Sequence, residues 1–363
     1  KNNNKSMAWR RAGKAVAVGL PTTFLGCAGF YRWKNRVELP PHELLDLHGR
    51  NIVLTGGTSG IGRALAGALV SRGAHVIVGS RDMSRGQALC VALTKDDRKP
   101  ACGSVRAFHL DLEDASSISD FVAEVKESVA GTGGVHAFVN AAAEIKSEFV
   151  RGATGLDATF TINHLGPQQL VSALAPELRR AASAERHARV VLVGSRLERR
   201  GVVDLASLQK NGLPDPRMLE KFEPMTNYGS SKLANMLLCK ELSARFGASH
   251  VDVSIVSPGM VNTELWRNFP AWYRMLTYPV RATFLRSPQQ GAEGILYAIA
   301  AREIEGVSGG YMCDGKMIES SETAQDAEKA AALFLICSKV IEQAKVVYFA
   351  KRLGIDLPPG ALS

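Results

Sequence analysis

Tyr228 and Lys232 are the two residues of this sequence best suited to transferring a proton. They stand four positions apart in Tyr-Gly-Ser-Ser-Lys, so on a helix they lie on one face. Apolar residues recur at a helical period after them, which predicts a helix over 228–246. A neighbouring ammonium favours a phenolate, so we expect Lys232 to lower the pKa of Tyr228. Such a phenol can donate a proton to a carbonyl or accept one from a hydroxyl.

A glycine-rich loop gives this pair a context, because surface helices carry the same tyrosine–lysine spacing by chance. The loop, Gly-Gly-Thr-Ser-Gly-Ile-Gly, follows the first predicted strand. Glycines let the backbone turn tightly and approach a pyrophosphate, which sits at the positive end of the following helix. The alternative is a plain strand-to-helix turn. The predicted cofactor contacts here are Gly56, Thr58, Ser59, Gly60, Ile61 and Gly62.

The end of the second predicted strand indicates which dinucleotide binds. An acid at this place would bind the ribose 2′-hydroxyl of NAD, but the sequence has Ser80 followed by Arg81, which suits a 2′-phosphate. NADP is therefore the predicted cofactor. NAD remains the alternative, since Asp82 could supply the acid.

Asp111 ends the third predicted strand and could accept a hydrogen bond from the adenine amine, with Leu112 beside it. The alternative for Asp111 is a helix cap, a role for which Asp114 competes.

Strands and helices alternate through most of the chain. The predicted strands lie at 51–55, 75–79, 105–110, 135–140, 189–193, 251–256 and 310–313, and the helices at 60–72, 83–93, 115–130, 158–180, 228–246 and 288–301. Nearly continuously apolar strands that alternate with helices indicate a parallel sheet buried on both faces. Right-handed crossovers then give a doubly wound, Rossmann-type α/β sheet.

Composition sets the limits of this domain. The 363 residues suit one large domain with extensions or two small domains, and the 46% hydrophobic fraction is enough for a sizeable core. We expect a tail over 1–40, a dinucleotide-binding oxidoreductase domain over 41–320 and a helical extension over 321–363. The six cysteines form no metal-binding spacing, which predicts reduced thiols and no metal. The tail holds eight of the nine excess positive charges, so a nucleic-acid-binding face is not expected.

The tail contains 17 residues without a charge, from 15 to 31, with basic residues on both flanks. This length is the lower limit for a membrane-spanning helix, and Pro21 weakens that interpretation. Three alternatives stay open: a membrane anchor, an organelle-targeting segment, or an element packed on a partner. The chain starts at Lys1, so a tail that remains after processing favours the anchor over a transit peptide. The endoplasmic reticulum and the mitochondrion both fit.

The motifs in their order resemble the short-chain dehydrogenase/reductase family over about residues 50–316. The residues that carry the resemblance are the glycine loop, Asp111, Asn140, Asn163 in Thr-Ile-Asn-His-Leu-Gly, Ser195, Tyr228 with Lys232, and Ser257-Pro258-Gly259 followed by Thr263. Asn163-His164-Leu165-Gly166, Ser80-Arg81-Asp82 and the 33-position gap from Ser195 to Tyr228 resemble the retinol-dehydrogenase-like branch.

This resemblance implies a role for each matched residue. Tyr228 would be the general acid/base, and Lys232 would lower its pKa and bind the nicotinamide ribose. Ser195 would orient the substrate oxygen, although alone it could be a strand-end cap. Asn163 would hold a water in a proton relay through Lys232, although alone it could mark a helix kink. Asn140 would contact the cofactor, and the loop around the nicotinamide would comprise Pro258, Gly259 and Thr263.

Two departures from the family pattern affect the cofactor site. The family usually has Asn-Asn-Ala-Gly after the fourth strand, where this chain has Asn-Ala-Ala-Ala at 140–143. The change removes polar contacts and places Ala143 close to the cofactor. Gly194 replaces the more usual serine before Ser195.

The segment after Thr263 is rich in aromatic and apolar residues, and in this family it resembles a substrate lid. These residues are Trp266, Phe269, Trp272, Tyr273, Leu276, Tyr278 and Phe284. They predict an apolar substrate such as a retinoid, steroid or lipid-like alcohol or ketone. The alternative is that they pack the lid on the domain or touch a membrane interface.

The predicted function is a membrane-associated, NADP(H)-dependent oxidoreductase for an apolar alcohol or carbonyl. The alternative is a dehydrogenase-like accessory subunit of a membrane complex, with the tail and a C-terminal helix, expected over 323–353, as docking elements. That helix is predicted to pack on the domain or on a second copy, a second membrane contact being the alternative. A homodimer therefore stays open.

Overall fold

The computed structural model describes residues 37–40, 42–94, 103–152, 154–209, 222–268 and 271–352. The apolar segment from 15 to 31 and Phe269 lie outside these ranges. Within the described ranges, no helix combines the length and the apolar character that crossing a bilayer requires.

One eight-stranded sheet forms the centre of the molecule, in the order β3-β2-β1-β4-β5-β6-β7-β8. The strands are β1 (Asn51–Thr55), β2 (His75–Ser80), β3 (Ser104–His109), β4 (Ala137–Asn140), β5 (Ala188–Val193), β6 (Val251–Ser257), β7 (Gly310–Cys313) and β8 (Lys316–Met317). All pairs are parallel except β7 with β8. The doubly wound parallel sheet is therefore confirmed. Strand β8 was not predicted, because two exposed residues show no period.

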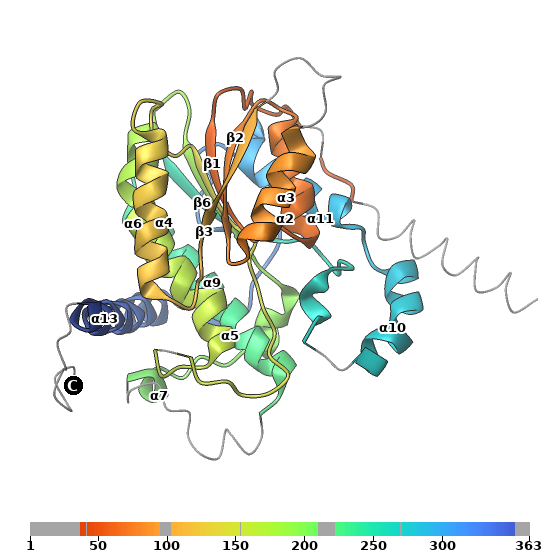
Figure 1. Ribbon diagram of the computed structural model, residues 1–363, viewed down its shortest axis with the longest axis vertical. Coiled ribbons are helices and arrows are strands. Elements are labelled where there is room, and N and C mark those ends of the chain that lie inside the picture. The colour runs from red at the N-terminus through yellow and green to blue at the C-terminus, as the bar shows by residue number, and fades with distance from the viewer. Residues whose placement is uncertain are drawn as a thin grey trace, which may run out of the picture.

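Helices cover both faces of the sheet (Figure 1). One face carries α2 (Gly60–Val70), α3 (Met83–Thr94) and α11 (Pro288–Ala300), and the other carries α4 (Ala115–Val129), α6 (Gly166–Ala181) and α9 (Pro224–Phe246). Each face buries its own apolar cluster, as two packed helical layers require. Shorter helices are α7 (Leu205–Gln209), α12 (Glu322–Gln325), η2 (Arg196–Arg200), η3 (Glu264–Trp266) and η4 (Arg302–Ile304).

The single helix predicted over 158–180 is interrupted. It consists of α5 (Ala158–Phe160), a π-turn η1 (Thr161–Leu165) and α6. Pro167 has no amide hydrogen, so it cannot donate to the carbonyl of Asn163 one helical turn earlier. Asn235 of α9 makes that bond instead, with Nδ2 2.9 Å from the Asn163 oxygen.

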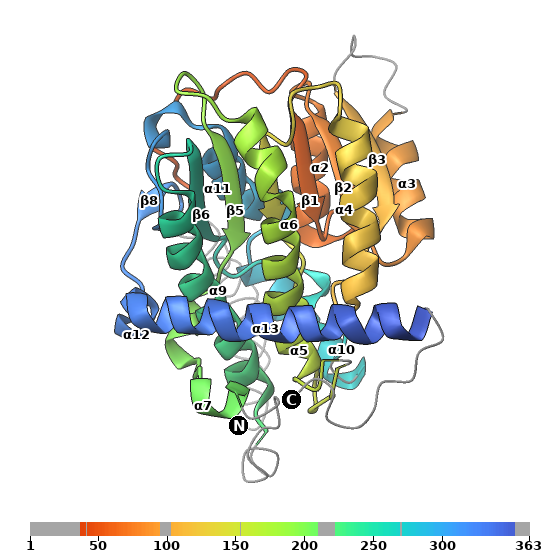
Figure 2. The same ribbon diagram turned by 90° about the vertical axis from the view of Figure 1, so that its left-hand side faces the viewer.

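The C-terminal extension packs on the domain as one long helix, α13 (Ala327–Arg352), close to the predicted 323–353. Figure 2 shows it running across α9, α6 and α4. Leu333, Cys337 and Ile341 are buried at successive helical turns, and Gln168 Nε2 of α6 donates to the carbonyl of Phe334 at 2.9 Å. Within its described part, this helix therefore uses one apolar face for packing inside the chain.

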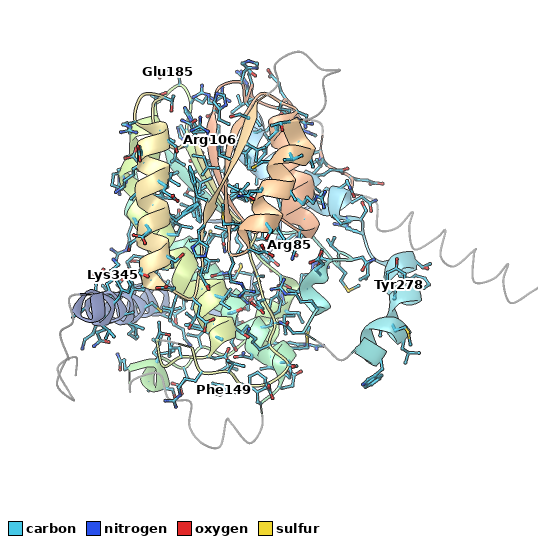
Figure 3. All side chains as sticks on the ribbon, in the orientation of Figure 1. Arg85, Arg106, Phe149, Glu185, Tyr278 and Lys345 are labelled. Atoms are coloured by element: carbon cyan, nitrogen blue, oxygen red, sulfur yellow. The ribbon has the colours of Figure 1, made fainter. Side chains whose placement is uncertain are left out.

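Helix α10 (Ala271–Phe284) stands away from the sheet (Figure 1). The sequence predicted a lid here but no helix. Trp272, Met275, Leu276 and Tyr278 are exposed, and Figure 3 shows Tyr278 on this outlying helix. These four side chains are therefore largely exposed to solvent, and both interpretations of the lid residues stay predictions.

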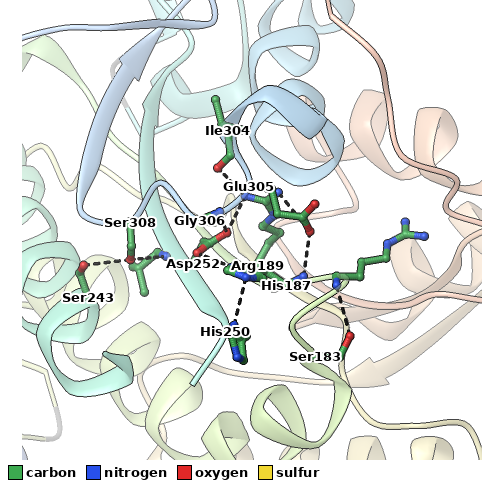
Figure 4. Close-up of polar contacts among 12 residues, drawn as sticks. Ser183, His187, Arg189, Ser243, His250, Asp252, Ile304, Glu305, Gly306 and Ser308 are labelled. Atoms are coloured by element: carbon green, nitrogen blue, oxygen red, sulfur yellow. Dashed lines mark hydrogen bonds and ion pairs between the residues drawn. The ribbon is translucent and has the colours of Figure 1, made fainter. Parts of the chain in front are cut away.

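A polar network whose centre, Arg189 and Asp252, is buried holds the amino ends of β5 and β6 together (Figure 4). Arg189 and Asp252 are opposite each other in the strand register, with NH1 2.9 Å from Oδ2. His187 Nδ1 lies 2.9 Å from the other carboxylate oxygen, and His250 Nδ1 lies 3.1 Å from His187 Nε2. Arg189 NH1 also donates to the carbonyl of Ile304, so the network joins both strands to the segment after α11.

Replacing Asp252 by Ala should destabilise the fold strongly. It removes the closer of the two carboxylates near the buried guanidinium of Arg189, leaving only Glu305 at 3.9 Å, and breaking such a buried pair costs about 3–5 kcal/mol of the free energy of unfolding. Urea denaturation measures this loss. As a control, Glu342→Ala removes a carboxylate from an exposed pair with Lys345 in α13 and should cost less than about 1 kcal/mol. Equal losses in the two variants would contradict the importance of the buried network.

Candidate active site

A cleft of about 1310 Å³ opens where the parallel strands end at their carboxyl termini. Nearly all the predicted site residues line this cleft, although they lie far apart in the sequence. The predicted residues that line it are Gly56, Thr58, Ser59, Gly60, Ile61, Gly62, Ser80, Arg81, Asp111, Leu112, Ser195, Tyr228, Lys232, Pro258, Gly259 and Thr263. Asn140 and Asn163 do not line it.

Tyr228 and Lys232 share one face of α9, as predicted, and both are buried. Lys232 Nζ donates to the carbonyl of Val193 at 2.8 Å, where β5 ends. The same nitrogen lies 5.4 Å from the centroid of the Tyr228 ring. The hydrogen bond from helix to strand therefore fixes the ammonium beside the phenol.

Burial, rather than the neighbouring charge, sets the pKa values of this pair. Burial raises the pKa of Tyr228 and lowers the pKa of Lys232 to about 8, because both charged forms lose their hydration. The pKa of Tyr228 therefore does not fall below its ordinary value, and stabilisation of the tyrosinate by the Lys232 charge stays a prediction. The hydration that each ion loses outweighs the attraction between them.

Ser195 follows β5, and its position is consistent both with a cap and with a group that orients the substrate. Its Oγ accepts a hydrogen bond from the amide of Leu197 at 3.2 Å, so it caps the short helix η2. It also lines the cleft together with Tyr228. Because the bond to Leu197 uses the oxygen as an acceptor, the hydroxyl hydrogen remains able to donate.

Asn163 lies in the π-turn, fully buried behind the wall of the cleft. Its Oδ1 accepts from the amide of Glu144 at 2.8 Å, and its Nδ2 donates to the Glu144 carbonyl at 2.9 Å. Nδ2 also reaches Ser231 Oγ at 3.0 Å, and Ser231 donates to the Tyr228 carbonyl at 2.7 Å. The side chain thus joins the loop after β4 to the start of α9. The water relay through Asn163 stays a prediction.

The glycine loop fits a pyrophosphate. A Cβ on Gly62 would lie 2.2 Å from the Gly56 carbonyl oxygen, and Gly56 and Gly60 have φ of +70° and +48°. Only glycine therefore permits this turn. Ser59 precedes α2 but makes no side-chain cap, and no acid occupies the first turn. The positive end of α2 is open toward the cleft, as binding of an anionic phosphate requires.

The side chain of Asp82, after β2, accepts hydrogen bonds from within the protein. Its Oδ1 accepts from the amide of Ser84 at 2.9 Å and from the Ser84 hydroxyl at 2.8 Å, and these contacts lower the pKa of Asp82. Ser80 Oγ donates to the Asp82 carbonyl at 2.7 Å. The acid that could have favoured NAD is thus engaged at the start of α3, although it lines the cleft together with Arg81 and Arg85.

Asp111 and Asp114 divide the two roles considered for Asp111. Asp114 caps α4 by accepting from the amide of Ser116 at 2.8 Å. Asp111 Oδ1 accepts from the amide of Glu113 at 3.0 Å and lines the cleft. A contact between Asp111 and adenine stays a prediction.

Asn140 is fully buried and ties β4 to β1. Its Oδ1 accepts from Thr55 Oγ1 at 2.6 Å, and Thr55 Oγ1 also accepts from the amide of Ala142 at 3.2 Å. The following loop approaches the glycine loop closely, since a Cβ on Gly56 would lie 2.7 Å from the Ala142 nitrogen. Asn140 thus positions cleft-lining backbone without lining the cleft itself.

An ion pair supports the loop after β6. Arg286 forms two bonds to Asp314, 2.6 and 2.7 Å long, and its NH1 also donates to the carbonyl of Pro258 at 3.2 Å. Gly259 has a φ of +75°, and a Cβ there would lie 2.9 Å from the same guanidinium. The predicted nicotinamide loop is therefore held by residues that the sequence analysis did not select.

Other charged residues that line the cleft and were missed by the sequence analysis include Arg85, Glu144, Glu264 and Arg267. Arg85 follows Arg81 by four positions, a spacing that could have indicated a second cation for one phosphate. Glu144 is an acid at the start of a loop that directly follows a buried strand. The other two follow Thr263, in a segment analysed only for its aromatic residues.

The chain is similar to known proteins in both sequence and fold. A family model of short chain dehydrogenases matches residues 50–207. Human retinol dehydrogenase 14 is 29% identical over 307 residues, 81% of this chain and 87% of that protein. Mouse polyprenol dehydrogenase is 32% identical over 295 residues, 81% of this chain and 84% of that protein. The crystal structure of an uncharacterised protein from Mycobacterium paratuberculosis matches with a TM-score of 0.61 and 25% identity, over 83% of this chain and 96% of that one.

The lowered pKa of Lys232 should appear in the pH dependence of stability. Between about 8, its pKa in the fold, and 10.5, its ordinary value, the unfolded chain binds the proton more tightly. The free energy of unfolding should therefore rise with pH across this window. Relative to Lys232→Met, the unsubstituted protein should gain about 3 kcal/mol between these limits.

Urea denaturation at several pH values measures this difference. Lys240→Met serves as the control, because Lys240 lies on the same helix but is not fully buried. Its stability should follow that of the unsubstituted protein across the window. Parallel pH profiles for all three proteins would show that Lys232 has no lowered pKa.

Proposed function

The chain belongs to the short-chain dehydrogenase/reductase family, in its retinol-dehydrogenase-like branch, and on this basis we propose an NADP(H)-dependent interconversion of an apolar alcohol and its carbonyl compound. As a member of that family it is an oxidoreductase acting on CH–OH and C=O groups. One observation carries the proposal: Tyr228, Lys232 and Ser195 line the same cleft as the glycine loop.

The chain's own residues bind the substrate oxygen and exchange its proton. When bound, the dinucleotide supplies or accepts the hydride at its nicotinamide ring. Ser195 donates its hydroxyl hydrogen to the substrate oxygen and so orients it. Tyr228 has a raised pKa that keeps it protonated, so it can donate its proton to the oxygen of a carbonyl as that oxygen gains negative charge. The ammonium of Lys232 stabilises the tyrosinate that remains.

The preference for NADP over NAD is supported by charge at the end of β2. Two cations, Arg81 and Arg85, line the cleft there, and Ser80 stands where an acid would bind the 2′-hydroxyl. Asp82 is engaged with Ser84 at the start of α3. A 2′-phosphate would therefore meet two guanidinium groups.

An apolar substrate is supported by apolar side chains in the lining of the cleft that holds Tyr228. Among them are Ile145, Ile162, Val193, Leu197, Met225, Met260, Leu265, Leu276 and Leu285. Two relatives carry names that specify an apolar alcohol, retinol or polyprenol. We therefore infer a retinoid-like or polyprenol-like alcohol or carbonyl as the substrate class. The accessory-subunit alternative gains no support from these names or from the site.

Tyr228→Phe should abolish turnover without loss of the fold. Removing the proton donor should lower kcat for NADPH-dependent reduction of retinal by at least about 100-fold. The dissociation constant of NADPH should change little. Absorbance at the NADPH band measures the rate, and quenching of tryptophan fluorescence measures binding. Tyr278→Phe is the control, because Tyr278 is exposed on α10 and does not line the cleft.

The same assay tests the cofactor and the substrate class. The unsubstituted protein should turn over retinal faster with NADPH than with NADH, and faster than the short polar glyceraldehyde. A faster rate with NADH would refute the cofactor preference. Equal rates on glyceraldehyde would refute the apolar substrate, and an active Tyr228→Phe protein would refute the proposed chemistry.

We also propose that the protein associates with a membrane. The support is the basic and apolar sequence of residues 1–36 and the exposed apolar residues of α10. The full chain should float with phosphatidylcholine–phosphatidylserine vesicles, and removal of residues 1–36 should reduce bound protein at least about tenfold. A full chain that stays in the dense fraction would refute the proposal.

A further inference from the structure

Two ion pairs join opposite sides of the cleft, and the chemistry proposed above uses neither. Arg81 NH1 lies 3.5 Å from Glu144 Oε2, and Arg85 NH2 lies 2.9 Å from Glu264 Oε2. Arg81 follows β2 and Glu144 follows β4, while β1 lies between these strands in the sheet. The first pair therefore crosses the carboxyl end of β1, where the glycine loop begins.

Glu144 carries a carboxylate that is almost fully buried, since its side chain is only 6% exposed. Its Oε1 lies 3.1 Å from Lys146 Nζ and accepts from Asn268 Nδ2 at 2.9 Å. Its Oε2 lies 3.4 Å from Arg267 NH2 as well as near Arg81. Burial alone would raise the pKa of Glu144, but the bonds from Asn268 and Lys146 and the nearby cations lower it. The carboxylate is therefore charged.

The acid of the first pair is fixed and the arginine can move. Both backbone polar groups of Glu144 are bound to the buried amide of Asn163. The side chain of Arg81 is 53% exposed. In the second pair, Arg85 is 43% exposed and Glu264 54%. Each contact can thus be exchanged by moving a long, solvated guanidinium.

The pairs also hold down the segment after β6. A Cβ on Gly60 would lie 3.1 Å from Thr263 Cγ2, so this segment contacts the glycine loop. Glu264 is bound to Arg85, and Arg267 and Asn268 are bound to Glu144. The segment from 263 to 268 therefore lines the cleft and is tied to Arg85 on one side and to Glu144 on the other.

We propose that the Arg81–Glu144 and Arg85–Glu264 pairs form a carboxylate clasp over the dinucleotide cleft, which the 2′-phosphate of NADP(H) opens by taking the place of both carboxylates. The inference rests on the proposed function, because it assigns these residues to the binding of its cofactor. A phosphate can accept bonds from both guanidinium groups, as the carboxylates do. NADH would have to part the same pairs without offering them a new partner.

The clasp has a thermodynamic signature that distinguishes it from simpler roles of Glu144. If a closed form excludes the dinucleotide, the apparent affinity falls with the fraction of open protein. Removing one carboxylate raises that fraction, so the binding of NADPH and of NADH should tighten together. Simple repulsion of the 2′-phosphate by Glu144 would affect NADPH alone. A role in positioning Arg81 for the phosphate would weaken NADPH binding upon substitution.

The experiment measures dissociation constants of NADPH and NADH by tryptophan fluorescence at low ionic strength. Glu144→Gln keeps an oxygen that accepts from Asn268, and Glu264→Gln tests the second pair in case the first variant does not fold. Each should bind both dinucleotides about threefold more tightly. Glu148→Gln is the matched control, because Glu148 is exposed in the same loop and does not line the cleft. Its constants should equal those of the unsubstituted protein.

Every other pattern overturns the clasp. The clasp is excluded if a variant binds only NADPH more tightly, if it binds NADPH more weakly, or if neither variant changes. None of these outcomes would contradict the proposed oxidoreductase function. The same tightening in Glu148→Gln would assign the effect to net charge. An unsubstituted protein that binds neither dinucleotide would instead refute the proposed function.

Discussion

The site depends on one buried contact, the hydrogen bond from Lys232 to the carbonyl at the end of β5. An ammonium that has lost its hydration must keep a strong partner, and the last carbonyl of a strand provides one. This contact places Tyr228, on the same face of α9, beside the residues that follow β5. Proton chemistry and sheet geometry are therefore linked, because the helix cannot rotate without removing the partner of a buried charge.

A second buried polar set fixes the other wall of the cleft. Pro167 deprives the Asn163 carbonyl of its helical donor, and Asn235 replaces it from α9. The Asn163 amide is then available to the backbone of Glu144 and to Ser231. A break in one helix thus joins the loop after β4 to the helix that carries Tyr228.

Charged residues have different roles at the two ends of the parallel strands. At the amino ends of the strands, Arg189 and Asp252 form an ion pair in the interior and join β5 to β6. At the carboxyl ends of the strands, Arg81 and Arg85 are half-exposed and pair with acids across the cleft. In a parallel sheet all carboxyl ends of the strands, and therefore the ligand cleft, lie on one side. The amino ends on the opposite side can therefore carry contacts that only stabilise the fold.

The sequence alone determined the alternating strands and helices, the glycine loop and the spacing of Tyr228 and Lys232, because each is a pattern among near neighbours. Only the tertiary structure decided the rest. The π-turn depends on Asn235, the charge of Glu144 depends on Lys146, Arg267 and the amide of Asn268, and the raised pKa of Tyr228 depends on the packing around it. These properties arise between residues far apart in the chain, where burial and the choice of partner follow from the fold and not from local periodicity.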